Sequence, residues 1–269
     1  MENADKTGYV LDGELLVTGN GVYTFAYTYR APIDDAQVLL ISMNHWGDED
    51  YFERVGEILR EAEVVVFEGV RGESWGDYSS IWDKLDELGK DKLDLETSEF
   101  YSLASKFQRR VIKAAELKLE QAALPESESW ISGDEAFWHS LTKDDGALAR
   151  YSGSLLAAAK RVPPELISSF SAFLKMKSRL ISAQNLRRAY GEYLLLTCDT
   201  PDLYVSLTIE YVRETLAVET LERELVTRKP GKIALKFGVS HISRIRRTLE
   251  SLGYKLLKTE RLLNIKFSD

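Results

Sequence analysis

The sequence predicts an α/β (α+β) fold with a central β-sheet system built from two strand-His-helix-strand pseudo-repeats and a large helical insertion between them. Short, largely apolar runs, typical of strands covered on both faces, occur at 38–41, 64–67 and 233–237. His45 and His241, two of the three histidines in the chain, each follow such a run by four residues and precede a helical pattern. Chance placement rarely produces this match, so we expect one structural unit to occur twice.

The amino-terminal part of the chain is predicted to form a β-hairpin. Residues 9–31 contain two segments rich in Val, Tyr, Phe and Thr, separated by Gly19, Asn20 and Gly21. Such a turn sequence between alternating segments favours a hairpin. Pro32 and the acidic pair that follows it then turn the chain toward the first buried strand.

The first of the two units extends from the strand at 38–41 to Glu68. Acidic residues after His45 are typical of a helix N-terminus, and Asp50 with Glu53 has the spacing of a capping box. Apolar side chains then recur at helical spacing before the second strand, which ends in Glu68. The unit therefore places a carboxylate and an imidazole beyond the carboxyl ends of neighbouring strands, where open α/β sheets bind ligands.

The middle of the chain, from 97 to 200, is predicted to be a helical insertion. Apolar residues recur every three or four positions through 98–124, which predicts one long amphipathic helix that Pro125 ends. A short helix is expected after Gly133. Further helices are predicted at 147–161, 164–196 and 202–228.

The second unit repeats the arrangement of the first near the end of the chain. A strand at 233–237 leads through Gly238 to His241, and a helix with one apolar face follows. Gly253 is typical of a helix C-terminus, and another strand is expected at 254–257.

Composition and charge restrict the class of protein. With 269 residues, 44% of them hydrophobic and 29% charged, the chain can bury a substantial core. A net charge of -8 argues against a nucleic-acid partner, because phosphate binding depends on clustered Lys and Arg. The single cysteine, Cys198, excludes an internal disulfide. We find no signal-peptide pattern and no apolar run long enough to span a bilayer, so we expect a cytoplasmic protein.

The two matched histidines and Glu68 carry the predicted chemistry. A histidine at the start of a helix lies at the positive end of the macrodipole, which favours the neutral ring. If the two units face each other, His45, Glu68 and His241 converge. Two imidazoles and a carboxylate can hold a divalent metal with an open position, or act without metal as a base and its orienting partner. The alternative is that both histidines only cap helices and close the strand exits.

These residues resemble the TraB/GumN family, within the superfamily that also contains the Tiki proteases and the erythromycin esterases. SMNH at 42–45 and GVSH at 238–241 are similar to the two Gly-x-x-His motifs of that family, and the segments VVVFEG and ESLGY resemble its neighbouring elements. The resemblance covers residues 37–262. Ser42 is a departure, because the family usually has glycine there.

The resemblance implies a site made of His45, Glu68, Arg213 and His241. It implies a metal-dependent hydrolase, peptidase-like or esterase-like, that acts on a peptide or a small molecule. The metal would be Mn, Co or Zn, and its ligands would be His45, Glu68 and His241. The alternative is a non-catalytic, pheromone-shutdown-like regulatory protein that binds a peptide or small ligand in the same pocket. The chain, 1–269, would be one TraB/GumN-like domain. It would consist of an N-terminal β-hairpin (1–36), a first half-site (37–96), the helical insertion (97–200) and a second half-site (201–269).

Arg213 is predicted to point at this cluster. It lies in a helix beside Tyr211, Val212 and Leu216, an apolar neighbourhood in which an unpaired guanidinium is costly. A surface partner would contribute little, whereas Glu68 or the substrate could engage the planar guanidinium. We expect Arg213 to stabilise a developing oxyanion, and Arg213→Lys to impair function with little change in stability.

Overall fold

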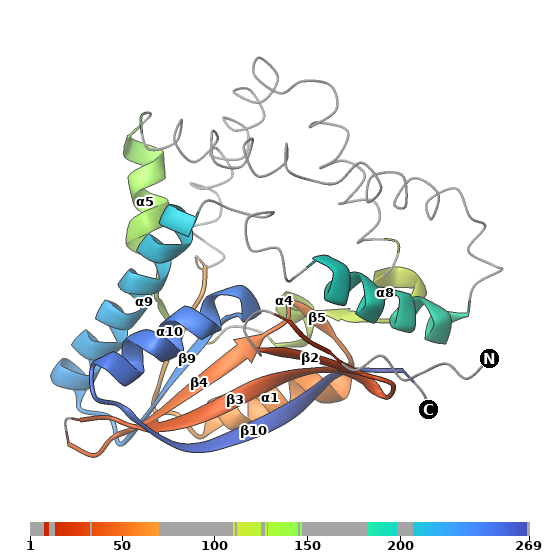
Figure 1. The fold of residues 1–269 in the computed structure, drawn as a ribbon. Helices are drawn as coiled ribbons and strands as arrows, with labels where there is room; N and C mark the ends of the chain where they lie inside the picture. Colours follow the sequence, from red (N-terminus) through yellow and green to blue (C-terminus); the bar gives the residue numbers. More distant parts are fainter. Residues whose placement is uncertain are drawn as a thin grey trace.

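The structure, a computed structural model, has a mixed α/β architecture, in agreement with the predicted fold class (Figure 1). Ten strands and six helices lie within the described part of the chain. The described residues are 8–10, 14–32, 34–69, 110, 112–124, 127, 129–144, 146, 182–197 and 207–267.

Eight of these strands form one mixed sheet: β1 (Gly8–Val10), β2 (Leu15–Thr18), β3 (Gly21–Arg30), β4 (Gln37–Met43), β6 (Val64–Phe67), β8 (Ile131–Ser132), β9 (Lys232–Gly238) and β10 (Lys255–Lys266). Their order is β1-β2-β3-β4-β9-β6-β8, and β10 also pairs with β3. Strands β4, β9, β6 and β8 run parallel, whereas β3 is antiparallel to β4 and to β10. The short strands β5 (Trp46–Gly47) and β7 (Lys118–Leu119) form a separate ladder.

Two crossover connections span this sheet in opposite directions. The first leads from β4 through α1 (Glu49–Arg60) to β6 and passes β9, and the second leads from β9 through α10 (Val239–Ser251) to β10 and passes β4 and β3. Because crossovers between parallel strands are right-handed, opposite directions place the two helices on opposite faces. Figure 1 shows α10 above the sheet and α1 below it.

Each face of the sheet carries its own apolar core. Val38 and Leu40 of β4 pack with α10 and with α9 (Leu207–Arg228). The alternate residues Leu39 and Ile41 pack with α1 on the other face. All four side chains are buried, so the two-sided burial predicted from this apolar run is confirmed.

The predicted strands are confirmed. Strands β4, β6 and β9 contain the three apolar runs. Gly19 and Asn20 join β2 to β3, and Gly253, with a φ of 90°, follows α10. Strand β10 extends beyond the predicted 254–257 because it pairs with β3 along the whole of that strand.

The start of α1 differs from the prediction. The helix begins at Glu49 with Asp48 as its N-cap residue, so Asp50 and Glu53 do not form the expected capping box. The Asp48 side chain makes no capping hydrogen bond and instead accepts one from the backbone N–H of Lys266 at 2.8 Å. Contact with the end of β10 therefore engages the cap residue, which local spacing does not reveal.

The predicted long helix at 98–124 is wrong in its second half. Glu116 has a φ of 58°, a left-handed conformation that interrupts the helix, and β7 and α4 (Glu120–Ala123) follow it. Pairing of β7 with β5 thus overrides helix propensity. The start of this helix and the helix predicted at 147–161 lie outside the described residues. Where the chain is described, the other predicted helices are confirmed as α5 (Glu135–Lys143), α8 (Ala183–Thr197) and α9.

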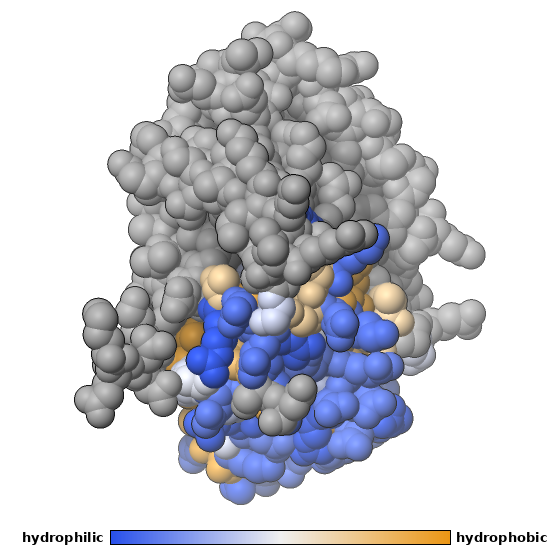
Figure 2. All heavy atoms as spheres, turned by 90° about the vertical axis from the view of Figure 1, so that its right-hand side faces the viewer, coloured by the Kyte–Doolittle hydropathy of each residue, from blue (hydrophilic) through white to orange (hydrophobic). Residues whose placement is uncertain are grey.

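The described surface is largely polar on the face drawn in Figure 2, with hydrophobic side chains in small, scattered patches. None of the described helices is long and apolar enough to cross a membrane.

Candidate functional site

Four neighbouring parallel strands end at one edge of the sheet and bring the site together. Gly238 is the last residue of β9, Glu68 directly follows β6, and His45 and Asp134 each lie two residues beyond β4 and β8. The sequence prediction that residues after the two apolar units meet at the carboxyl edge is therefore confirmed.

Glu68 lies at the centre of this edge and both of its carboxylate oxygens are engaged. Oε1 accepts a hydrogen bond from Arg213 Nη2 at 2.7 Å and lies 3.2 Å from His241 Nε2. Oε2 accepts the backbone N–H of Gly238 at 2.6 Å. Burial raises the pKa of Glu68, but the positive charges of His241 and Arg213 outweigh it and hold that pKa well below its usual range. Glu68 is therefore an ionised anchor and not a free base.

Arg213 of α9 reaches inward to two carboxylates, as predicted. Its Nε donates to Asp134 Oδ2 at 2.8 Å, and its Nη2 lies 2.7 Å from both Glu68 Oε1 and Asp134 Oδ2. Its Nη1 lies 3.4 Å from His241 Nε2, and the guanidinium stacks near Trp138 at 5.4 Å from the ring centroid. The planar group thus joins α9 to the ends of β6 and β8.

Asp134 is a site residue that the sequence did not reveal. Its side chain is fully buried, and besides Arg213 it accepts hydrogen bonds from the backbone N–H of Gly69 at 2.8 Å and from Trp138 Nε1 at 3.2 Å. A carboxylate with this many donors is well compensated for its burial. No local pattern marked Asp134, because the two-residue strand β8 before it was not predicted from the sequence.

His241 lies in the first turn of α10 and is buried between two carboxylates. Its Nδ1 is 3.3 Å from Glu214 Oε1 and its Nε2 is 3.2 Å from Glu68 Oε1. Phe237 packs edge-on against the ring, at 5.9 Å between centroids. Arg244 Nε lies 3.1 Å from the other Glu214 oxygen, which nevertheless makes no hydrogen bond with the described residues. Both ring nitrogens of His241 therefore contact carboxylates, and the ring also packs against Phe237.

His45 is arranged differently. Its side chain is 58% exposed, and its Nδ1 lies 2.6 Å from Glu120 Oε2. The backbone N–H of Glu120 also donates to the His45 carbonyl at 2.9 Å, so α4 is fixed to the histidine twice. Among the described residues, none makes a hydrogen bond to Nε2 of His45. One ring nitrogen is thus oriented by a carboxylate, and the other lies toward Gly238 without a hydrogen bond to the described residues.

The expectation that His45 lies at a helix start is wrong. Strand β5 separates His45 from α1, so the histidine does not lie in the first turn of the helix and the macrodipole argument for a neutral ring does not apply to it. Partial burial lowers the pKa of His45, but the hydrogen bond with Glu120 and the negative charges of Glu68 and Glu120 outweigh it and raise that pKa above 6.5. Lys236 opposes this shift in part.

Lys236 completes the surroundings of Glu120. This lysine of β9 is buried, pairs with Glu120 Oε1, and has its ammonium 5.7 Å from the Phe67 ring centroid and 5.4 Å from that of Trp130. A lysine inside an apolar strand was a visible signal of a buried partner. The partner itself, Glu120, lies 116 positions away in sequence and could not be identified from spacing.

Gly238 allows Glu68 and His45 to approach the same point of the backbone. A Cβ at this position would lie 2.8 Å from Glu68 Oε2 and 3.5 Å from His45 Nε2. The first of these distances is shorter than a Cβ tolerates, so steric crowding by Glu68 explains why the second motif has glycine at 238. At the other motif, Ser42 has a fully buried side chain whose hydroxyl makes no hydrogen bond within the described part of the chain.

The predicted metal set, His45, Glu68 and His241, does not fit a metal ion in this arrangement. Arg213 already provides the cation at Glu68, and the second Glu68 oxygen accepts the Gly238 N–H. Within the described ranges, no group of three or more His, Cys, Asp or Glu residues is arranged to hold a metal.

Comparison of the chain with family models, with curated proteins and with solved structures gave no match. The resemblance to the TraB/GumN family therefore depends on the motif residues alone and stays a hypothesis.

Proposed function

We propose that the protein is a hydrolase of the peptidase or esterase type, with His45 as the residue that transfers protons. The observation that supports this best is a side chain that is 58% exposed, with Nδ1 held 2.6 Å from the carboxylate of Glu120 and Nε2 making no hydrogen bond to the described residues. An oriented imidazole with one accessible nitrogen is the usual general base and acid of hydrolytic sites.

In this proposal, Nε2 of His45 removes a proton from a water molecule while the water oxygen attacks the substrate carbonyl carbon. The imidazolium that forms is stabilised by Glu120, which accepts its Nδ1–H. His45 then returns the proton to the leaving oxygen or nitrogen as the bond between it and the carbonyl carbon breaks. The reaction consumes one water and needs no redox partner.

Arg213 and Glu68 have a positioning role in this scheme. The expected role of Arg213 as an oxyanion donor is less well supported, because its Nε and Nη2 point at the carboxylates of Asp134 and Glu68. These contacts, together with that of His241 to Glu68, fix the backbone of Gly238 beside His45. The four predicted site residues thus divide into one reactive histidine and a rigid support.

We also propose that the two crossover units are structural pseudo-repeats. Support comes from the order of strand, helix and strand that both share apart from the short β5 in the first, from their first strands being adjacent and parallel, and from the register that pairs Met43 with Gly238 and Ser42 with Phe237. His45 and His241 each occupy the exit of one unit. The TraB/GumN resemblance, which also rests on these two exits, agrees with this interpretation.

The test is hydrolysis of generic peptide and aryl ester substrates by the chelator-treated protein, with and without added Mn, Co or Zn. We expect turnover that does not require metal, and a loss of about 10²-fold or more in kcat/KM for His45→Gln. His139→Gln is the matched control, because this exposed histidine lies in α5 and contacts neither His45 nor Glu120 in any described interaction. Equal activity of His45→Gln and the control would refute the role of His45. Binding without turnover would favour the regulatory alternative.

A further inference from the structure

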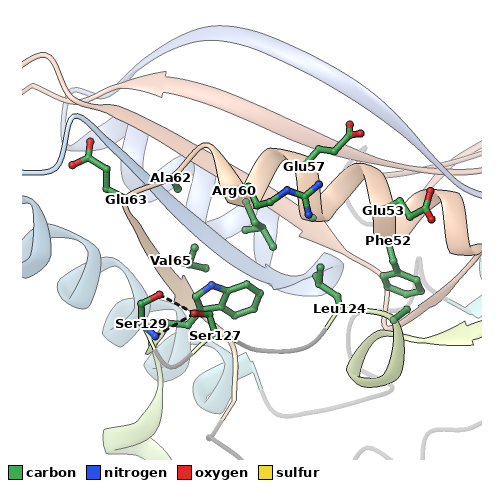
Figure 3. Close-up of a pocket in the computed structure, with 14 residues that line it drawn as sticks. Phe52, Glu53, Glu57, Arg60, Ala62, Glu63, Val65, Leu124, Ser127 and Ser129 are labelled. Carbon is green, nitrogen blue, oxygen red and sulfur yellow. Dashed lines mark hydrogen bonds between the residues drawn. The ribbon is translucent and has the colours of Figure 1, made fainter.

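A second concave surface lies on the α1 face of the sheet, away from α9 and α10. Its volume is about 630 Å³, within the range of small-molecule sites. Figure 3 shows Phe52, Glu53, Glu57 and Arg60 on α1, with the Glu57 carboxylate pointing away from the other labelled side chains, and Ser127 and Ser129 at the opposite end. The floor is apolar and belongs to the core of this face, and it is formed by Phe52, Leu59, Val65, Leu124 and Trp130.

The rim of this groove is acidic. Glu53, Glu57 and Glu63 line it, and among the described lining residues Arg60 is the one cation. Glu57 pairs with Arg54, and Glu63 accepts the backbone N–H of Gly231. Glu53 is exposed and has no hydrogen bond or ion pair with the described residues. A negative rim around an apolar floor favours a ligand that is both apolar and cationic.

The groove is connected to His45 through two short paths. Helix α4 has Glu120 at its first position, against His45, while Ala123 and Leu124 at its end line the groove. Trp130 forms part of the groove floor and has Lys236 Nζ 5.4 Å from its ring centroid. A ligand that moves the end of α4 or the Trp130 ring therefore moves the helix that carries Glu120 or the residue next to its partner Lys236.

We propose that this groove binds an apolar organic cation, such as an aromatic or alkyl ammonium, and that its occupation is transmitted to His45 through α4 and through Trp130 and Lys236. The ammonium lies at the glutamate rim and the apolar part lies on the floor next to Trp130. The transmission step concerns the position of Glu120 relative to His45, and it holds whether or not His45 is catalytic.

The experiment uses phenethylammonium as the probe, with phenethyl alcohol as its neutral match and phenylacetate as its anionic match. Binding is measured by calorimetry on the full chain at constant ionic strength. In parallel, the three histidine rings are observed by NMR, with the His45 signals assigned from His45→Gln. We expect the cation to bind more tightly than either match, and to shift the His45 ring signals while leaving those of His139 unchanged.

Variants identify the site. Glu53→Gln should weaken binding of the cation about twofold to fivefold, the effect of one exposed charge pair. Trp130→Phe, which preserves the apolar floor, should weaken it about twofold to fivefold as well by reducing the contact with the ring. Glu219→Gln, an exposed glutamate of α9 on the other face, should have no effect.

Tightest binding of phenylacetate or of the alcohol would overturn the proposed ligand class. Equal binding by wild type, Glu53→Gln and Trp130→Phe would overturn the site. Binding in the groove without any shift of the His45 ring would overturn the connection. Since no readout depends on turnover, these outcomes are distinct from failure of the proposed hydrolase.

Discussion

Replacement of Arg213 tests whether the centre of the site is held by one guanidinium. Arg213 is the only cation that the described contacts place on Asp134, and it also pairs with Glu68. The Asp134 side chain is 0% exposed and that of Glu68 is 15% exposed, so solvent cannot replace the lost charge at either of them. Arg213→Met should therefore leave Asp134 without the cation that the described contacts give it, and Glu68 with His241 alone.

The expected cost follows from this burial. Removing one partner of a buried ion pair lowers the free energy of unfolding by about 3–5 kcal/mol. Arg213→Lys keeps the charge, but an ammonium cannot reproduce the planar contacts of Nε and Nη2, so we expect a loss of about 1.5–3 kcal/mol, close to one charge-assisted hydrogen bond. The small stability change predicted for Arg213→Lys from the sequence is thus revised, because that prediction did not include Asp134.

Urea unfolding followed by circular dichroism at neutral pH measures both values. The double variant Arg213→Met, Asp134→Asn should be more stable than the sum of the single changes by about 0.5–3 kcal/mol, since it removes both members of the pair. Because the Arg213–Asp134 pair is buried, we expect added salt to change these differences in unfolding free energy very little. If Arg213→Lys and Arg213→Met both unfold within about 0.5 kcal/mol of the wild type, the guanidinium does not hold the site together.

Three further outcomes are expected. Gly238→Ala places a Cβ 2.8 Å from Glu68 Oε2 and should lower the free energy of unfolding by about 1–3 kcal/mol in urea; no loss would contradict the steric reason for glycine. Ser42→Ala removes a buried hydroxyl that makes no hydrogen bond to any described residue, so the stability of the variant should equal or exceed that of the wild type, and a clear loss would indicate a partner for the hydroxyl. Glu120→Gln should lower the pKa of His45, measured by NMR titration, from its raised value toward or below 6.5. In the wild type, the His45–Glu120 pair stabilises the fold at low pH, and this contribution should be lost as the pH rises through the raised pKa of His45. The variant should not show this loss.

The sequence was sufficient for the framework of the fold, because that framework follows from local patterns. Apolar runs at 38–41 and 233–237 predict buried strands whatever their neighbours are, and a glycine such as Gly253 predicts a helix end. Errors occurred where a distant segment decides the local structure. Asp48 is engaged by the end of β10, and the chain after Glu116 leaves the helix to pair with β5.

The same distinction applies to the site. Glu68 and His241 could be predicted because they follow strands at the carboxyl edge of the sheet, and their 3.2 Å contact bears out that expectation. Asp134 and Glu120 come from the segment between the two units, where no pattern indicates which acid reaches the site. Their contacts with Arg213 and His45 span 79 and 75 positions.

The two histidines differ in chemistry although both follow adjacent parallel strands. His241 lies under α9, and carboxylates contact its two ring nitrogens at 3.2 and 3.3 Å, which leaves the ring 3% exposed. His45 receives one carboxylate, from Glu120, because β5 pairs with β7 and so brings α4 to its Nδ1 side only. Of the two imidazoles, one is therefore buried and the other is more than half exposed. What distinguishes them is the segment packed beside each histidine, and this is why we propose the reactive role for the histidine that Glu120 orients.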